Sequence, residues 1–294
     1  MSKYDILDSA PYDEEEKARL ATFPKFIGPI QIGDLYFTLK EDWDINEDWD
    51  IEWYRTAEVT ESPEHRGGDN YPGLTIVHIP TVISNNDEEF NVTCIKSGAF
   101  MHCRSLGSVN IPDSIVRIED YAFAYCPCLT SIEIPDSVTH IGDSAFLCCK
   151  LVSVKLPDSV LSIRDMAFYD ALVAVYNRHL FAHLPILYSG TYTIPNGIQT
   201  IAEGALGYHT KLTGIVIPDS VTYIGDNAFY HCDALTRLTC KAAIPPKLGK
   251  DVFLYVNTSI PLYVPAESIE LYKTAPQWQQ MNIQPIPVLI MASL

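Results

Sequence analysis

The sequence predicts a β-rich repeat solenoid, a coil of short strands joined by short helical turns. Two observations support this fold class. One phrase recurs along the middle of the chain at a nearly constant interval. Within each copy, apolar residues alternate with polar ones and then stop at a proline, which is typical of a short strand with one buried face. Units this small bury their apolar side chains only under neighbouring units, so we expect the copies to stack.

Each copy of the repeat begins at an isoleucine, and successive copies start 23, 23, 22, 38 and 23 residues apart. In the copy from Ile118, the segment Leu129 to Ile134 predicts the strand, and Pro135 ends it because proline cannot donate to a continuing ladder. Ala122 and Phe123 predict a short helical turn that directs an aromatic ring inward. The starting residues are Ile95, Ile118, Ile141, Ile163, Ile201 and Ile224.

The shared pattern I-G-D-x-A-F-x-x-C-x-x-L-x-x-I-x-I-P-D-S-V resembles the BspA-like leucine-rich repeats, a branch of the leucine-rich-repeat superfamily. The resemblance covers Ile95 to Cys240, with several copies in one register. It implies a curved leucine-rich-repeat coil with strands lining the concave side. It also implies a surface-exposed or secreted protein that binds host proteins or other cells.

The repeat boundaries divide the chain into four predicted parts. Residues 1–30 form an N-terminal leader segment, and 31–94 form a β-hairpin cap that covers the first coil. Residues 95–240 are the repeats, and the 38-residue step is interpreted as a projecting hairpin insertion at about 176–191. Residues 241–294 form a strand-helix cap and tail, with a strand ending at Val264 and a helix from Ser268 to about Trp278.

The charge and hydropathy of the chain exclude some classes of partner. A formal net charge of -17 repels phosphate groups, so we expect no nucleic acid ligand. The longest apolar runs are too short to span a bilayer, so we expect no membrane insertion. The N-terminus lacks the apolar stretch of a secretion signal, which leaves a cytoplasmic location as the alternative to the surface or secreted location that the resemblance implies.

Two sets of repeated residues are assigned to the core. One phenylalanine in each of five copies should point inward, namely Phe100, Phe123, Phe146, Phe168 and Phe229. Four cysteines share one position in their copies, namely Cys103, Cys126, Cys149 and Cys232. A disulfide between layers, or a thiolate metal site with His102 or Cys148, would explain this row. A ladder of small buried side chains explains it better, because the repeat alone sets the spacing.

The Asp-Ser pairs that follow each Ile-Pro form a second row. Aligned carboxylates suit calcium, but an aspartate after proline also accepts backbone N-H groups of its own turn. We favour the turn. The pairs are Asp113-Ser114, Asp136-Ser137, Asp158-Ser159 and Asp219-Ser220.

Two regions are candidates for binding. The acidic segment Glu41 to Tyr54 carries Trp43, Trp49 and Trp53 and suits a cation, a protein or a sugar ring, or is simply an acidic hairpin whose tryptophans fold onto the cap. The outward strand positions are compatible with a protein ligand or with a solvated face that binds nothing, but they lack the aromatic row that stacked sugars or bases need. The strand positions that we select are Ser131, Glu133, Lys155, Tyr176 and Arg237.

The residues give no reason to expect catalysis. The histidines fall at no metal or general-base spacing, and no phosphate loop or nucleophile elbow is present, so we expect no enzyme, cofactor or metal. The sequence therefore predicts a non-catalytic macromolecular-recognition module, a surface or secreted adhesin-like protein that binds a host or cell-surface protein. The alternative is an intracellular scaffold or regulatory protein.

Overall fold

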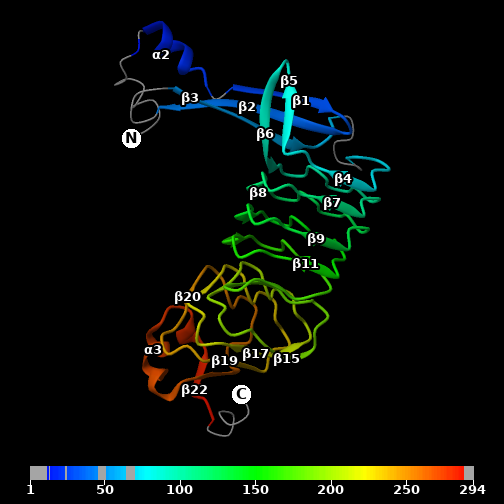
Figure 1. The fold of residues 1–294 in the computed structure, drawn as a ribbon. Helices are drawn as coiled ribbons and strands as arrows, with labels where there is room; N and C mark the ends of the chain where they lie inside the picture. Colours follow the sequence, from blue (N-terminus) through cyan, green and yellow to red (C-terminus); the bar gives the residue numbers. More distant parts are fainter. Residues whose placement is uncertain (1–11, 13, 24, 46–50, 64–69, 288–294) are drawn as a thin grey trace.

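The coil occupies most of the chain. The structure is a computed structural model, and it describes residues 12, 14–23, 25–45, 51–63 and 70–287. Figure 1 shows the coils stacked on one another from β4 to β22, with an antiparallel sheet at the N-terminal end. Each coil has three sides, which we call the inner face, the strand face and the turn face. No helix within these residues has the length and apolar character needed to cross a membrane.

The N-terminal sheet joins the coil directly. β1, β2 and β3 are antiparallel, and β3 then pairs in parallel with β6 of the β5-β6 hairpin. The hairpin turns at Asn86 and Asp87, both with positive φ, as a tight two-residue turn requires. β1 begins at Lys25, which lies inside the predicted leader segment. The elements are α2 (Glu14–Leu20), β1 (Lys25–Ile32), β2 (Leu35–Ile45), β3 (Ile51–Thr60), β5 (Val82–Asn85) and β6 (Glu88–Ile95).

The inner face consists of short parallel strands, one from each coil. β6, β8, β10 and β12 form one ladder, and β14, β16, β18 and β20 form a second. Each strand places one isoleucine or its equivalent inward, such as Ile118 and Ile141. The strands are β8 (Arg117–Ile118), β10 (His140–Ile141), β12 (Ser162–Ile163), β14 (Leu180–His183), β16 (Thr200–Ile201), β18 (Tyr223–Ile224) and β20 (Lys247–Leu248).

The strand face carries the Ile-x-Ile segments of the repeats. Its pairing is parallel but interrupted, because β4-β7 and β9-β11 form separate sheets, followed by a sheet of β15, β17, β19, β21 and β22. The strands are β4 (Ile76–His78), β7 (Ser108–Asn110), β9 (Ser131–Glu133), β11 (Ser153–Lys155), β15 (Gly190–Thr193), β17 (Leu212–Ile217), β19 (Arg237–Cys240), β21 (Pro261–Val264) and β22 (Asn282–Pro285).

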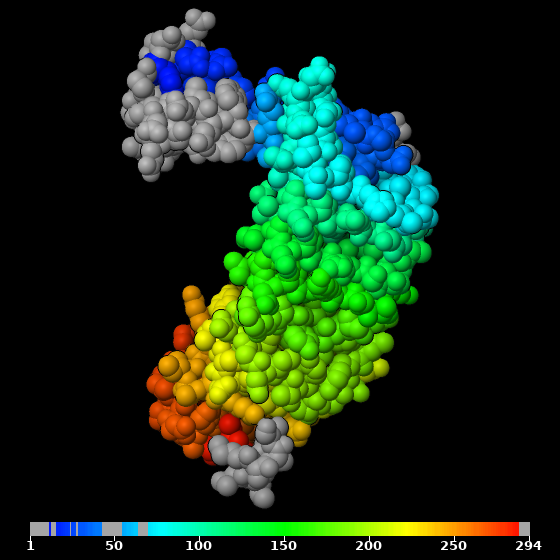
Figure 2. Space-filling view, viewed as in Figure 1, coloured from blue at the N-terminus to red at the C-terminus, as the bar shows by residue number. Residues whose placement is uncertain are grey.

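The bend of the stack corrects one expectation. The family resemblance implies that these strands line the concave side, but β7, β9 and β11 lie on the outer side of the bend and β8 lies on the inner side (Figures 1 and 2). Inner-face strands pair at each step from β6 to β12, whereas in the described chain β7 and β9 do not pair. A regular ladder holds strands about 4.8 Å apart. The coils are therefore closest together along the inner face.

The turn face is built from a five-residue turn in each regular coil, which we call the Ala-Phe turn. Its amides alternate in their partners: Ala122 N-H donates to the carbonyl of Glu119 in its own coil, while Phe123 N-H donates to the carbonyl of Ala145 in the next coil at 2.7 Å. The first and fifth residues of each turn have positive φ, for example Tyr121 and Tyr125. The turns are 98–102, 121–125, 144–148, 166–170, 204–208, 227–231 and 251–255.

A column of phenylalanine rings fills the interior behind the turn face. Phe100, Phe123, Phe146 and Phe168 are buried, and successive ring centroids lie 5.1, 5.3 and 5.2 Å apart with nearly parallel planes. Phe229 is also buried and stacks on Phe253 in the C-terminal half. The stacking makes each coil cover the ring of the previous one.

The hairpin expected at about 176–191 does not project from the coil. β13 (Val175–Tyr176) and β14 form an antiparallel pair, but β14 also pairs in parallel with β16 and takes a place in the inner face. Leu180 and Phe181 are buried in the core. The 38-residue step therefore contains two short coils, because its apolar residues gain more from burial in the stack than from exposure on a hairpin.

The C-terminal end closes with short elements. β21 is followed by η1 (Ala266–Ser268), α3 (Ile269–Thr274) and η2 (Trp278–Gln280), and then by β22. The helix is shorter than the stretch predicted from Ser268 to about Trp278. Pro276 explains its end, because the residue before proline avoids the helical region, and Ala275 is extended with ψ 134°.

Candidate binding surface

The selected strand-face residues are all exposed, but they do not form one uniform surface. Ser131 and Glu133 on β9 adjoin Lys155 on β11, and the Lys155 ammonium pairs with the Glu133 carboxylate. Arg237 lies beyond the interruption and donates to the Thr191 hydroxyl at 2.9 Å. This face can offer a partner small polar groups and one exposed ion pair, whose free-energy contribution is small.

Tyr176 does not lie in the regular strand-face ladder. It belongs to β13, and its ring is 46% exposed while stacking on buried Phe181 at 6.2 Å. Two other outward strand positions, Val216 and Thr239, are buried. The strand face therefore does not offer a continuous row of accessible side chains along the whole coil.

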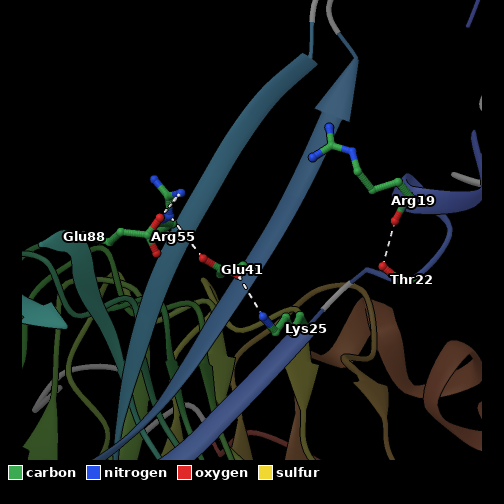
Figure 3. A network of polar contacts seen from close by, with 6 residues as sticks. All are labelled: Arg19, Thr22, Lys25, Glu41, Arg55 and Glu88. Carbon is green, nitrogen blue, oxygen red and sulfur yellow. Dashed lines mark hydrogen bonds and ion pairs between the residues drawn. The ribbon is translucent and has the colours of Figure 1, made fainter. Parts of the chain in front are cut away.

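The acidic tryptophan segment belongs to the N-terminal sheet. β2 and β3 pair Trp43 with Trp53, while Trp49 lies outside the described residues. Figure 3 shows the polar network on the described part of this sheet. There the Arg55 guanidinium donates to Glu41 at 3.3 Å and to Glu88 at 2.7 Å, and Lys25 lies 4.0 Å from Glu41. The network links β1, β2, β3 and β6 and neutralises part of the acidic charge.

The cysteine row is a ladder of hydrogen-bond donors inside the core. The Cys126 thiol donates to the Phe100 carbonyl at 3.1 Å, and the Cys149 thiol donates to the Phe123 carbonyl at 3.0 Å. Hydrogen bonds to neighbouring thiols raise the pKa of Cys126, and burial raises the pKa of Cys232 to about 12. All eight cysteines are free. At neutral pH these two thiols are protonated, which suits a structural role and not a nucleophilic one.

The serines of the Asp-Ser pairs also connect adjacent coils. The Ser137 hydroxyl donates to the Ile115 carbonyl at 2.6 Å, and Ser159 and Ser220 make the same bond in later coils. The Asp158 carboxylate accepts the Arg178 N-H of the following coil at 2.9 Å, and not an N-H of its own turn. In the described residues, no group of three His, Cys, Asp or Glu side chains is placed to hold a metal ion.

A row of exposed tyrosine and half-buried histidine side chains lies on the turn face, and we call it the aromatic row. Its members occupy the fifth position of their Ala-Phe turns, where the positive φ holds the side chain at the outer edge of the coil. Ring centroids of adjacent members lie 4.4 to 5.7 Å apart, and the rings are stacked. The row consists of His102 and Tyr125 in the first half and Tyr208, His231 and Tyr255 in the second half.

Two turns with the non-aromatic fifth residues Cys148 and Asp170 separate the two halves of the aromatic row. A pocket follows the second of these turns, and we call it the junction pocket. It has a volume of about 230 Å³, and its walls include Tyr169, Tyr208, Tyr230, Asn227 and Asp165. Among the backbone hydrogen bonds of the described residues, none joins turn 166–170 to turn 204–208. The second of the two short coils, which lies between these turns, has no Ala-Phe turn of its own, and the missing layer leaves the space open.

Negative charge collects at the junction. Burial raises the pKa of Asp165, and a repulsive effect of Asp143 raises it further. Burial also raises the pKa of Glu203, and the charge of Asp165 adds to that effect. Arg164 is a cation close to these groups, and its guanidinium donates to Asp143 at 3.1 Å. For both groups burial is the larger cause, and the neighbouring negative charge adds to it.

The sequence patterns did not predict the aromatic row or the junction pocket. The signal for the row was present, because the fifth position is aromatic in five of the seven Ala-Phe turns, namely at His102, Tyr125, Tyr208, His231 and Tyr255. The family pattern places the binding side on the strands, and aromatic residues are scarce there. The pocket depends on the division of the 38-residue step into two short coils. That division becomes visible only through the pairing of β14 with β16.

Comparisons with known proteins agree with the repeat pattern. The family model described as BspA type Leucine rich repeat region (6 copies) matches residues 83–174 and 178–274. No curated protein matches the sequence.

Solved structures of bacterial leucine-rich-repeat proteins are also similar to this chain. The T. pallidum Leucine Rich Repeat protein (TpLRR) is 22% identical with a TM-score of 0.44, over 73% of this chain and 86% of that one. A leucine-rich repeat protein from Eubacterium ventriosum is 20% identical with a TM-score of 0.45, over 80% of this chain and 71% of that one. The pneumococcal vaccine antigen PcpA is 16% identical with a TM-score of 0.36, over 90% of this chain and 99% of that one.

Proposed function

The chain belongs to the family of BspA-type leucine-rich-repeat proteins, and on this premise we propose that it is a surface or secreted adhesin-like protein that binds a host or cell-surface protein. Leucine-rich-repeat proteins are typically non-catalytic recognition modules, and the stacked coils expose a long surface for their length. The observation that carries the proposal is the aromatic row, which lies at equivalent positions along the turn face.

The aromatic row has the composition of a protein-binding surface. Tyrosine is enriched in protein interfaces because its ring buries a large area while its hydroxyl still makes hydrogen bonds. Tyr125, Tyr208 and Tyr255 are 39%, 38% and 59% exposed, so each ring has area left for a partner to cover. Because neighbouring rings stack, they lose little conformational freedom when a partner binds.

The charge of the chain favours a partner with a basic surface. The formal net charge is -17, and Asp165 lines the junction pocket with Glu203 close to it. Complementary charge accelerates association and selects among partners more than it adds affinity. We therefore expect binding to weaken as the salt concentration rises.

The experiment measures binding of the full chain to intact mammalian cells and to an array of purified extracellular-matrix proteins. The turn-face variant carries Tyr208→Ser and Tyr255→Ser, and the matched strand-face variant carries Ser131→Ala and Lys155→Ala. We expect the wild type and the strand-face variant to bind equally, and the turn-face variant to bind at least tenfold more weakly. Circular dichroism checks that both variants are folded.

The location of the protein provides the second test. Antibody labelling of intact producing cells should detect the chain on their surface or in the medium. Absence of binding to every cell and matrix protein, together with labelling only after the cells are opened, would contradict the adhesin role and support the intracellular scaffold alternative.

A further inference from the structure

The junction pocket has the shape of a cage and not of a flat platform. The Tyr208 ring is nearly perpendicular to Tyr169, at 83° and 6.3 Å, and steeply inclined to Tyr230, at 68° and 5.2 Å. Rings at these angles surround a small group from several sides. A sugar ring would instead need one open ring face of its own size, and the rings of Tyr208, His231 and Tyr255 already stack on one another.

A carboxylate forms one side of this cage. Asp165 lines the pocket and packs against Gly204, where an ideal Cβ would lie only 1.9 Å from the Asp165 Oδ1 atom. Gly204 also has a φ of +62°, a backbone conformation that glycine adopts without strain. The glycine therefore gives the carboxylate room beside the aromatic walls, which a residue with a side chain would take away.

The surrounding charges leave this carboxylate incompletely neutralised. Asp143 and Glu203 add negative charge near Asp165, and the nearby Arg164 guanidinium is directed to Asp143. A cation that entered the pocket would interact with the Asp165 carboxylate and with the negative faces of the tyrosine rings. A neutral ligand of the same size would gain neither interaction.

We propose that the junction pocket binds the cationic side chain of an arginine or a lysine presented by the partner protein. This inference rests on the proposed function, since it names the chemical group that the partner presents to the turn face. The aromatic row on either side of the pocket would cover the residues that flank this basic side chain. Arginine and lysine both carry the positive charge that the cage would bind, so the experiment tests each with a separate probe.

The experiment uses small probes and therefore needs no identified partner. The full chain, with ¹³C-labelled tyrosine rings, is titrated with four compounds and followed by NMR. The probes are Nα-acetyl-arginine methylamide, Nα-acetyl-lysine methylamide, the neutral isostere Nα-acetyl-citrulline methylamide, and methyl β-galactoside. Ring signals are assigned from the variants Tyr169→Phe, Tyr208→Phe and Tyr230→Phe.

We expect the arginine or the lysine probe to shift the signals of Tyr169, Tyr208 and Tyr230, with at least fivefold weaker binding of citrulline. Asp165→Asn should reduce the affinity for the cation at least fivefold, while Asp136→Asn, at an exposed turn on another side of the coil, should leave it unchanged. Glu203→Gln serves as a second variant in case Asp165→Asn is unstable, and it should weaken binding by a smaller factor.

Three results would overturn the pocket assignment: no shift of these rings at 50 mM cation, equal binding of arginine and citrulline, or preferential binding of the galactoside. These outcomes are separate from the test of the adhesin role. If the turn-face variant loses cell binding but no probe binds the wild type, the pocket assignment alone is rejected. Probe binding without any cell or matrix binding would reject the adhesin role alone.

Discussion

One buried histidine shows how a single residue adapts the repeat to the short coils. His209 occupies the position that cysteine has in the next coil, where Cys232 donates its thiol to the Leu206 carbonyl at 2.9 Å. The larger imidazole ring reaches the Leu184 carbonyl of the short coil at 2.8 Å, while its other nitrogen contacts Leu206 at 2.7 Å. A longer polar side chain thus makes the inter-coil bond that a thiol makes elsewhere.

Its neighbour His183 gives a pH prediction. Burial lowers the pKa of His183 to about 3, and its ring bonds the Ala171 carbonyl at 3.2 Å. An unfolded histidine binds a proton near pH 6.5, so protonation favours the unfolded chain below that pH. We expect His183 to reduce the free energy of unfolding by up to about 1.4 kcal/mol per pH unit between pH 6.5 and 3. Urea unfolding at pH 7, 5.5 and 4.5 measures this.

The variant His183→Gln isolates this contribution, because glutamine can keep a hydrogen bond but does not titrate. As the pH falls, the free energy of unfolding of the wild type should decrease more than that of the variant. Parallel pH profiles of the two proteins would show that His183 is not buried in its neutral form.

At the scale of the element, the glycine of the Ile-Gly-Asp segment is required by the close approach of adjacent coils. A Cβ on Gly142 would lie 2.5 Å from the backbone nitrogen of Asp120, a contact that no side-chain movement can relieve. Gly225 and Gly249 meet the backbone of the previous coil in the same way. Gly107 is different, since its nearest atom would be 3.6 Å away.

The matched substitutions Gly142→Ala and Gly107→Ala test this account of the inner face. We expect Gly142→Ala to lower the free energy of unfolding by about 1–3 kcal/mol, as overpacking does in a rigid interior. Gly107→Ala should change it by less than about 0.5 kcal/mol. Denaturant unfolding of both variants gives the comparison, and equal effects would show that the coils do not approach closely at Gly142.

Asn177 connects the first short coil to the repeat before it. Its Nδ2 donates to the carbonyls of Pro157 at 2.9 Å and Val160 at 3.2 Å, and its Oδ1 accepts the N-H groups of His179 and Leu180. The bond to Val160 replaces the hydrogen bond that a serine hydroxyl donates to the equivalent carbonyl in the regular coils. One buried amide therefore both continues the inter-coil ladder and closes the tight turn of the short coil.

Substitution of Asn177 should separate these two roles. We expect Asn177→Ala to destabilise the fold by about 2–4 kcal/mol, since it leaves buried polar groups without partners. Asn177→Ser should cost less, because a hydroxyl can still reach Val160. The exposed residue Asn282 provides the control, and Asn282→Ala should have little effect. Thermal and urea unfolding measure the series; an Asn177→Ala variant as stable as Asn282→Ala would contradict the assignment.

The regular elements were predictable from the sequence, and the irregular ones were not. Recurring Ala-Phe and Ile-Pro pairs indicate the stacked coil because each unit of this size needs its neighbours to bury Phe123 or Ile132. The place of β14 was not predictable, since Leu180 and Phe181 lack the repeat pattern and enter the stack only through tertiary pairing with β16. The family resemblance places the binding side on the strand face, so it gave no indication of the aromatic row on the turn face.

At the scale of the whole molecule, the short coils divide the stack without separating it into two bodies. The inner-face ladder stops at β12 and resumes with β13 and β14, and the turn face is open at the junction pocket. The core nevertheless continues through the junction, because Ala171, Phe181 and Leu184 are buried in one cluster with the regular coils. The proposed binding side depends on this continuity, since only a continuous stack holds the two parts of the aromatic row in line.

Amide hydrogen exchange of the full chain, followed residue by residue, tests the stacking most directly. The N-H groups of Phe100, Phe123 and Phe146 donate to the next coil, and so do those of Leu206 and Phe229 beyond the junction. In a stacked, cooperative fold these amides should exchange only when neighbouring coils open, at rates far below that of an exposed turn residue outside the coils, such as Gly73. Rapid exchange at these five amides would contradict the account, because coils that do not bond to one another cannot align the turn face for a partner.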